Sequence, residues 1–305
     1  MINNEQRFAL HTISNSTNLT FDRYAYSRYK YGDSIQAEKF GDELFTGFLD
    51  KYRDFLLSLN QQLVAMSSPR GVIPPAVYYI FQTFFKKLNR FLQSNGREPA
   101  VEHTIHRIGT IAEDYSILSK RERLDRLIDE RYSIDRHALT NKFLLFVDDI
   151  RITGKADYPI QVVGYIFTPR SFFLFTGIHE MNIIRLLQTS NIHNSRLFIY
   201  YAQLINDQIP TSFEYELNRC AIYNLDQLLK IIHNPLTTFQ INTRILKEIL
   251  RSNSSELDHF LQSISTDLMS QLYHACFACN YQTIEIFADT LEYLHRCLEQ
   301  RQNAK

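Results

Sequence analysis

An unbroken apolar run, Phe143–Val147, restricts the fold of this chain more than any other feature. A continuous apolar run of this length is typical of a β-strand that is covered on both faces, as strands are in a parallel sheet. A similar run covers residues 197–204. Because segments of helical periodicity alternate with these runs, the sequence predicts an α/β fold in which helices flank a parallel sheet.

Further strands are expected at 62–66 and 101–108. Apolar side chains recur at helical spacing in three segments of the front portion, 34–59, 74–91 and 121–132. From about residue 226 onward only helices are expected, at 226–233 and 243–252 and as a long pair over 256–300. No glycine follows Gly177, which agrees with a helical rear portion.

These patterns divide the chain into three parts. Residues 1–20 are polar and rich in Asn, Ser and Thr, so we expect a loose N-terminal arm. Residues 21–235 are expected to form the α/β core, and residues 236–305 a helical C-terminal extension.

Charge and hydropathy limit the partners. The chain has 33 Lys and Arg against 33 Asp and Glu, and this balance argues against nucleic-acid binding through bulk charge. No apolar run approaches the roughly 20 residues that a membrane span needs, and the first residues lack the pattern of a secretion signal. We therefore expect no nucleic-acid or membrane partner and a cytoplasmic location.

Four cysteines are too few for a disulfide scaffold. Cys276 and Cys279 form a CxxC pair beside His274, which by ligand type could bind zinc. Because the surrounding sequence has helical periodicity, small apolar roles inside a helix are the favoured interpretation.

Two adjacent acids, Asp148 and Asp149, follow the apolar run, and Thr153-Gly154 comes soon after. Ligands of open α/β sheets bind at the carboxyl ends of the strands. Adjacent carboxylates cannot both be paired in a core, so we expect them to meet hydroxyls, a cation or water. A Thr-Gly turn can present a hydroxyl and backbone amides to a phosphate. A sugar phosphate would satisfy each of these groups. Ile150 stands where a haloacid-dehalogenase phosphatase needs its second Asp, which excludes that class.

This succession of strand, paired acids and Thr-Gly resembles the binding motif for 5-phosphoribosyl 1-diphosphate (PRPP) in type I phosphoribosyltransferases. The resemblance implies that Asp148 and Asp149 contact the ribose hydroxyls and could also reach the Mg²⁺ that is bound with PRPP. It implies that Thr153, Gly154 and Lys155 hold the 5′-phosphate.

Two other segments stand in the order that this family shows. Ser68, Arg70 and Gly71 follow the first strand of the predicted core, where the family has its diphosphate loop. Residues 109–126 stand where the family has a catalytic hood loop, with Tyr115, Lys120 and Arg121 as candidates. For Arg70 a pairing with a surface acid is as good an interpretation on local sequence, and for Lys120 and Arg121 a solvated helix face is the better one.

The match is closest to the phosphoribosyltransferase-like proteins of bacterial stress-response and tellurite-resistance-type gene clusters. The segments that carry it are Tyr26–Asp33 (YSRYKYGD), Asp114–Ser116 (DYS) and Glu214–Asn218 (EYELN). The resemblance covers about residues 24–250.

One departure concerns the phosphate loop. In the family this loop runs directly into a helix, whereas here residues 155–175 intervene before a second Thr-Gly, Thr176-Gly177. We interpret 155–175 as an insertion. Proximity to the acids favours Thr153-Gly154 as the phosphate cradle, and a place at a helix N-terminus favours Thr176-Gly177.

The resemblance implies a glycosyltransferase-class enzyme that transfers a phosphoribosyl group from PRPP, with Mg²⁺, to an unidentified small-molecule acceptor and releases diphosphate. Because the insertion puts catalysis in doubt, the alternative is a non-catalytic PRPP or nucleotide sensor, or a partner-binding scaffold. Dimers are common in the family, so the resemblance is compatible with a homodimer, but the sequence does not show the oligomeric state.

Overall fold

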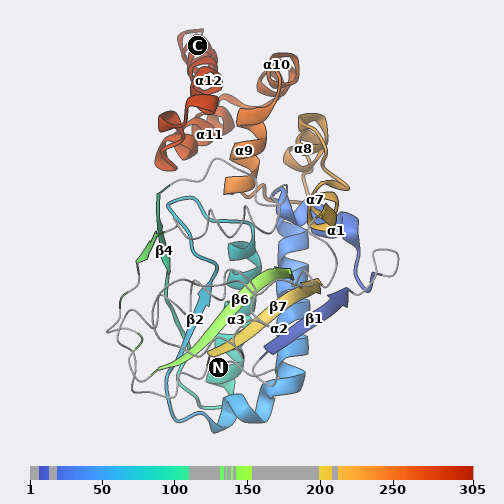
Figure 1. Ribbon diagram of the computed structural model, residues 1–305, viewed down its shortest axis with the longest axis vertical. Coiled ribbons are helices and arrows are strands. Elements are labelled where there is room, and N and C mark those ends of the chain that lie inside the picture. Colours follow the sequence, from blue (N-terminus) through green and yellow to red (C-terminus); the bar gives the residue numbers. More distant parts are fainter. Residues whose placement is uncertain are drawn as a thin grey trace, which may run out of the picture.

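The computed structural model describes residues 7–13, 19–109, 131–133, 135, 139, 142–152, 199–207 and 212–304. A five-stranded sheet occupies the centre of this part of the chain (Figure 1). Its order is β1-β7-β6-β2-β3, and each neighbouring pair of strands is parallel. The strands are β1 (Arg7–Ile13), β2 (Leu63–Ser67), β3 (Val101–Glu102), β6 (Phe143–Ile152) and β7 (Ile199–Asp207). The predicted α/β architecture with a parallel sheet is confirmed.

Four helices in the described part of the chain form the first hydrophobic core with this sheet, and the second and third of them lie across one face of it (Figure 1). They are α1 (Arg23–Lys30), α2 (Ser34–Ser58), α3 (Val77–Ser94) and α7 (Ser212–Arg219). Side chains alternate between the two faces of a strand, so Phe143, Leu145 and Val147 of β6 enter this core together. Leu144 and Phe146 on the other face are buried as well. The apolar run is therefore covered on both faces, as predicted.

A second hydrophobic core belongs to the C-terminal helices, which lie together beyond the sheet in Figure 1. These elements are α8 (Leu225–Ile232), α9 (Thr243–Arg251), α10 (Ser254–Ser263), α11 (Thr266–Ala278), the 3₁₀ helix η3 (Tyr281–Thr283) and α12 (Glu285–Asn303). Tyr31, directly after α1, is fully buried in this second core. None of the helices in the described ranges is long and apolar enough to cross a membrane.

The predicted N-terminal arm needs correction, because residues 7–13 form β1 at the edge of the sheet. Ile13 is fully buried, and Phe8 and Leu10 pack against the first core. Gly47 of α2 admits this contact, since a Cβ there would lie 2.9 Å from Phe8 and 2.8 Å from Leu10. A few apolar side chains thus anchor β1 as an edge strand of the sheet, although the composition of residues 1–20 is otherwise polar.

Three other elements differ from expectation. The strand over 101–108 is divided into β3 and β4 (His106–Ile108), and β4 pairs with β5 (Arg131–Ser133), whose first two residues were expected at the end of the helix over 121–132. The rest of that expected helix lies outside the described residues. In place of the expected pair of long helices over 256–300 there are three α-helices, α10, α11 and α12. The first break lies at Ser265, which caps α11, and the second at Asn280, which adopts a left-handed φ of 56°. Finally, β6 continues to Ile152 along β7, so both acids lie within a strand and not after it.

Candidate functional site

The topology of the sheet places a crevice at the carboxyl ends of β2 and β6. The chain leaves β2 toward β3 on one side and leaves β6 toward β7 on the other. Strand order therefore reverses between β2 and β6, and ligands of open α/β sheets bind at such a point. The ladder between these two strands ends at the pair Ser67↔Val147, so Ser68 and Asp148 are the next residues at the crevice.

Ser68 and Asp148 meet there. The Ser68 Oγ donates a hydrogen bond of 2.9 Å to Asp148 Oδ1, and the Asp149 amide donates another of 2.9 Å to the same oxygen. The Asp148 side chain is partly exposed. Burial, followed by the charge of neighbouring Asp149, raises the pKa of this carboxyl to about 7. Asp148 can therefore both accept and donate a proton near neutral pH.

Asp149 points to the opposite face of β6, because adjacent residues of a strand alternate. It is 5% exposed, and its Oδ2 accepts hydrogen bonds from Tyr29 at 3.0 Å and Tyr26 at 3.4 Å. The Lys30 ammonium forms an ion pair with the same oxygen. Burial alone would raise the pKa of Asp149, but the Lys30 charge and the hydrogen bonds from Lys30 and Tyr29 outweigh it and lower the pKa.

Lys30 is the residue of this site that sequence reasoning missed. Asp149 does meet hydroxyls and a cation, as expected, but they belong to the protein itself. The partners come from α1, far away along the chain, and no local pattern links them to β6. The segment Tyr26–Asp33 was singled out for its resemblance to a family branch, and that is the signal that could have indicated a role at the site.

Arg70 stands in the loop that follows β2. Its amide donates to the Ile105 carbonyl at 3.0 Å, and its carbonyl accepts from the Arg107 amide at 2.9 Å, so the backbone is fixed beside β4. The guanidinium carbon lies 4.4 Å from the centre of the Tyr78 ring. The guanidinium also lies 3.8 Å from Glu102 and donates to Thr104 Oγ1 at 3.2 Å. The pairing with a surface acid is thus present, and it still leaves the side chain 23% exposed.

Gly71 is exposed, and a Cβ added to it would meet nothing within 4 Å. Beyond it the loop reaches the C-terminal helices, since Ile73 packs against the second core and Pro74 accepts a hydrogen bond of 3.2 Å from the Thr243 amide. The loop between β2 and α3 is therefore held by backbone hydrogen bonds beside β4 and by contacts with the second core.

The remaining candidates lie outside the described residues, and their roles stay predictions. They are Tyr115, Lys120, Arg121, Thr153, Gly154, Lys155, Thr176 and Gly177.

Asp148 and Ser68 offer oxygen atoms, which are the ligands that Mg²⁺ prefers. Mg²⁺ commonly binds through one or two carboxylates together with substrate phosphates, and these residues fit that mode. Within the described ranges, no group of three or more His, Cys, Asp or Glu side chains could hold a metal ion. Cys276 is buried in α11, and Cys279 follows at the end of that helix.

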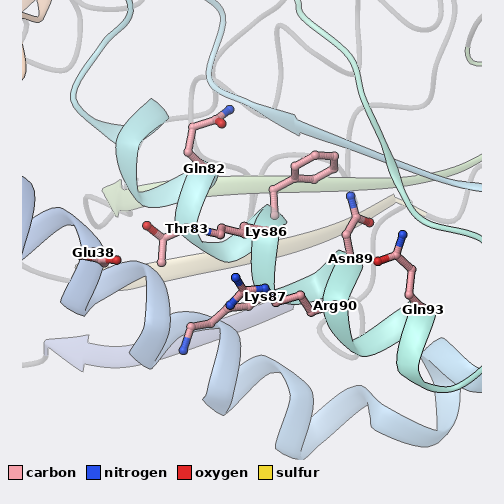
Figure 2. Close-up of a pocket in the computed structure, with 9 residues that line it drawn as sticks. Glu38, Gln82, Thr83, Lys86, Lys87, Asn89, Arg90 and Gln93 are labelled. Carbon is pink, nitrogen blue, oxygen red and sulfur yellow. The ribbon is translucent and has the colours of Figure 1, made fainter.

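A hollow elsewhere on the surface is lined mainly by α3, with Glu38 contributed by α2 (Figure 2). Its cationic side chains are Lys86, Lys87 and Arg90, and Lys87 forms an ion pair with Asp42. None of its lining residues is a candidate from the sequence, and Phe81, Phe84 and Leu88 of the same helix fill the core. We therefore assign this hollow no part in the site.

Comparisons with known proteins agree with this architecture. No curated protein matches the chain. The model of the family described as "PRTase ComF-like", in which PRTase stands for phosphoribosyltransferase, matches residues 4–163 and 173–294. The match includes the β2–β6 crevice and most of the C-terminal helices. Since it covers far more than half of the sequence, the chain belongs to the PRTase ComF-like family.

Proposed function

We propose that this protein binds PRPP with Mg²⁺ at the crevice between β2 and β6 and transfers the phosphoribosyl group to a small-molecule acceptor, releasing diphosphate. The observation that carries the proposal is the contact between Ser68 and Asp148 at the reversal of strand order, in a chain of a phosphoribosyltransferase-like family. Arg70 follows on the same loop and supplies a cation for an anionic ligand.

In this reaction the bond between C1 of the ribose and the diphosphate oxygen breaks, and a bond from C1 to the acceptor nucleophile forms. The diphosphate leaves with the bonding electrons, and the acceptor gives up a proton, which Asp148 or water would accept. Asp148 would accept hydrogen bonds from a ribose hydroxyl and fix the sugar. Arg70 would stabilise the negative charge that develops on the diphosphate. When bound with PRPP, Mg²⁺ would neutralise part of that charge.

The other proposed roles follow the family resemblance. Thr153, Gly154 and Lys155, or else Thr176 and Gly177, would hold the 5′-phosphate. Tyr115, Lys120 and Arg121 would close over the site. A homodimer, a cytoplasmic location and a place in a stress-response gene cluster belong to the same proposal.

Isothermal titration with PRPP and Mg²⁺ tests the binding step. We expect the wild-type protein to bind and Asp148→Asn to bind at least roughly tenfold more weakly, since the ribose loses a charged hydrogen-bond partner. Asp50→Asn, a change of the same kind at an exposed position of α2, should bind as the wild type does. Absence of PRPP binding by the wild-type protein would refute the proposal.

A binding-only function is the second candidate, and one observation favours it. Asp149, the other acid of the motif, is already neutralised by Lys30, so of the two acids of the motif only Asp148 faces the crevice. Measuring diphosphate release from PRPP with a panel of nitrogenous bases separates the two functions. Release shows a transferase, whereas tight binding without release from any base shows a sensor.

A further inference from the structure

We propose that Lys30 is the internal counter-ion of Asp149 and holds that carboxylate inside the fold, so that Asp148 alone of the two adjacent acids meets the ligand. The inference rests on the proposed function, because it assigns different roles to the two acids of the proposed PRPP site.

The contacts of Asp149 support this division. Its Oδ2 is surrounded by the Lys30 ammonium and the hydroxyls of Tyr26 and Tyr29, and its Oδ1 accepts a 2.8 Å hydrogen bond from the Ile150 amide. The protein thus supplies donors to both oxygens. Oδ2 already receives three donors, so a ribose hydroxyl could reach it only by displacing a buried donor, and leaving that donor unpaired is costly. Oδ1 has room for a second donor, but Asp149 is only 5% exposed, which restricts the approach of a ligand.

Lys30 in turn depends on Asp149 as its counter-ion. Its side chain is 10% exposed, and a buried ammonium without an anion is strongly unfavourable. Lys30 is the last residue of α1, and its carbonyl accepts a hydrogen bond of 3.3 Å from Asn242 Nδ2. The next residue, Tyr31, is fully buried in the second core. The backbone on this side therefore holds the ammonium in place.

Asp148 has the opposite environment. It faces the other side of β6, it is partly exposed, and its contacts in the described part of the chain are with Ser68 and the adjacent amide. It follows that Asp149 can be replaced without loss of PRPP binding, provided that Lys30 is replaced with it.

The test compares Lys30→Met, Asp149→Asn and the double variant with wild type and with Asp148→Asn. Each single change leaves an unpaired buried group and should lower the melting temperature, and the double change should recover much of that loss. Below its melting temperature the double variant should bind PRPP and Mg²⁺ within about threefold of wild type, while Asp148→Asn loses at least roughly tenfold. A double variant that folds yet binds as weakly as Asp148→Asn would overturn the inference.

If the double variant does not fold, a measurement on the wild-type protein can still show which of the two acids meets the ligand. The side-chain carboxyl carbons of aspartate are labelled with ¹³C, and the two resonances are identified by their loss in Asp148→Asn and Asp149→Asn. Adding PRPP and Mg²⁺ should shift the Asp148 resonance and leave that of Asp149 in place. A shift confined to Asp149 contradicts the inference.

Failure of the proposed function is distinguishable from failure of the inference. If the wild-type protein does not bind PRPP, the function is refuted. The pairing is then tested by a double-mutant cycle: the free energies of unfolding of wild type, Lys30→Met, Asp149→Asn and the double variant are measured without ligand. Non-additive losses support the pairing, and additive losses reject it.

Discussion

At the scale of the residue, Asp148 is a group whose ionisation weakens the fold. Burial and the charge of Asp149 raise the pKa of its carboxyl from 3.8 to about 7. Between these two values the folded protein binds more protons at this position than the unfolded chain does. The free energy of unfolding contributed by Asp148 therefore falls as the pH rises from about 4 to about 7. Asp149 acts in the opposite sense, because its lowered pKa stabilises the fold above its ordinary value of 3.8 and that stability is lost in more acidic solution.

Asp148→Asn should accordingly stabilise the protein at pH 8, by ~2 kcal/mol, and change its stability little at pH 4. The amide oxygen can still accept the hydrogen bonds from Ser68 and from the Asp149 amide, so the change removes a charge and keeps the contacts. Urea unfolding at pH 4, 6 and 8 measures the effect. An equal effect of Asp148→Asn at all three pH values would contradict the expectation. Functional residues often reduce stability, so we expect Asp148→Asn to be more stable than wild type and to bind PRPP more weakly.

At the scale of the element, the sequence predicted best those helices and strands that have a clear hydrophobic pattern within their own residues. The helix over 34–59 and the strand over 62–66 are present as α2 and β2, within a residue at their ends. The buried strand that carries Asp148 was likewise recognised from its apolar run. β1 was missed because its partner β7 lies almost two hundred residues away, and pairing at that distance leaves no local pattern.

The candidate site shows the same limit. Ser68, Arg70 and Asp148 were candidates from the sequence because each stands at the end of a strand or within one, in an order that resembles a known motif, and their roles stay predictions. The pairing of Lys30 with Asp149 was not found, because it joins α1 to β6 across the first core. Only the packing of α1 beside the sheet brings those two side chains together.

The turn between α1 and α2 depends on Gly32. Its φ of +88° is one that side chains disfavour, and a Cβ there would lie 2.6 Å from the Gln240 carbonyl oxygen. Gly32→Ala should therefore lower the free energy of unfolding by about 3 kcal/mol, from strain and from the clash together. Gly96→Ala is the matched control, since its φ is +68° and nothing lies within 4 Å of the added Cβ. We expect it to cost about 1 kcal/mol. Equal losses in chemical unfolding would show that the contact with Gln240 contributes nothing.

At the scale of the whole molecule, the candidate site lies where the two cores meet. Tyr29 belongs to the first core and Tyr31 to the second, with Lys30 between them. The Gln240 amide donates to the Gly32 carbonyl at 2.9 Å, and the Tyr79 hydroxyl donates to the Ile241 carbonyl at 2.7 Å. The segment 239–242 therefore contacts α3 as well as the turn after α1. The C-terminal helices thus support the element that holds Asp149 as well as the loop that carries Arg70.

Asn242 is the residue that joins the two cores most directly. It is fully buried, its side-chain oxygen caps α9 by accepting from the amides of Arg244 and Ile245, and its nitrogen donates to the Lys30 carbonyl. Asn242→Ala should cost about 2 kcal/mol, because it removes a helix cap and leaves buried polar groups unpaired.

The loss should extend to both cores. We expect Asn242→Ala to increase amide hydrogen exchange in peptides from β2 and from α10 by similar factors, because its hydrogen bonds join α1, which packs in the first core with β2, to α9, which packs in the second core with α10. Asn253→Ala is the control, because Asn253 caps α10 from an exposed position and contacts only that helix through its cap. Its effect should be confined to peptides from the C-terminal helices. Unchanged exchange in β2 of Asn242→Ala would contradict the expectation, because it would show that the sheet is stable without the Asn242 hydrogen bonds.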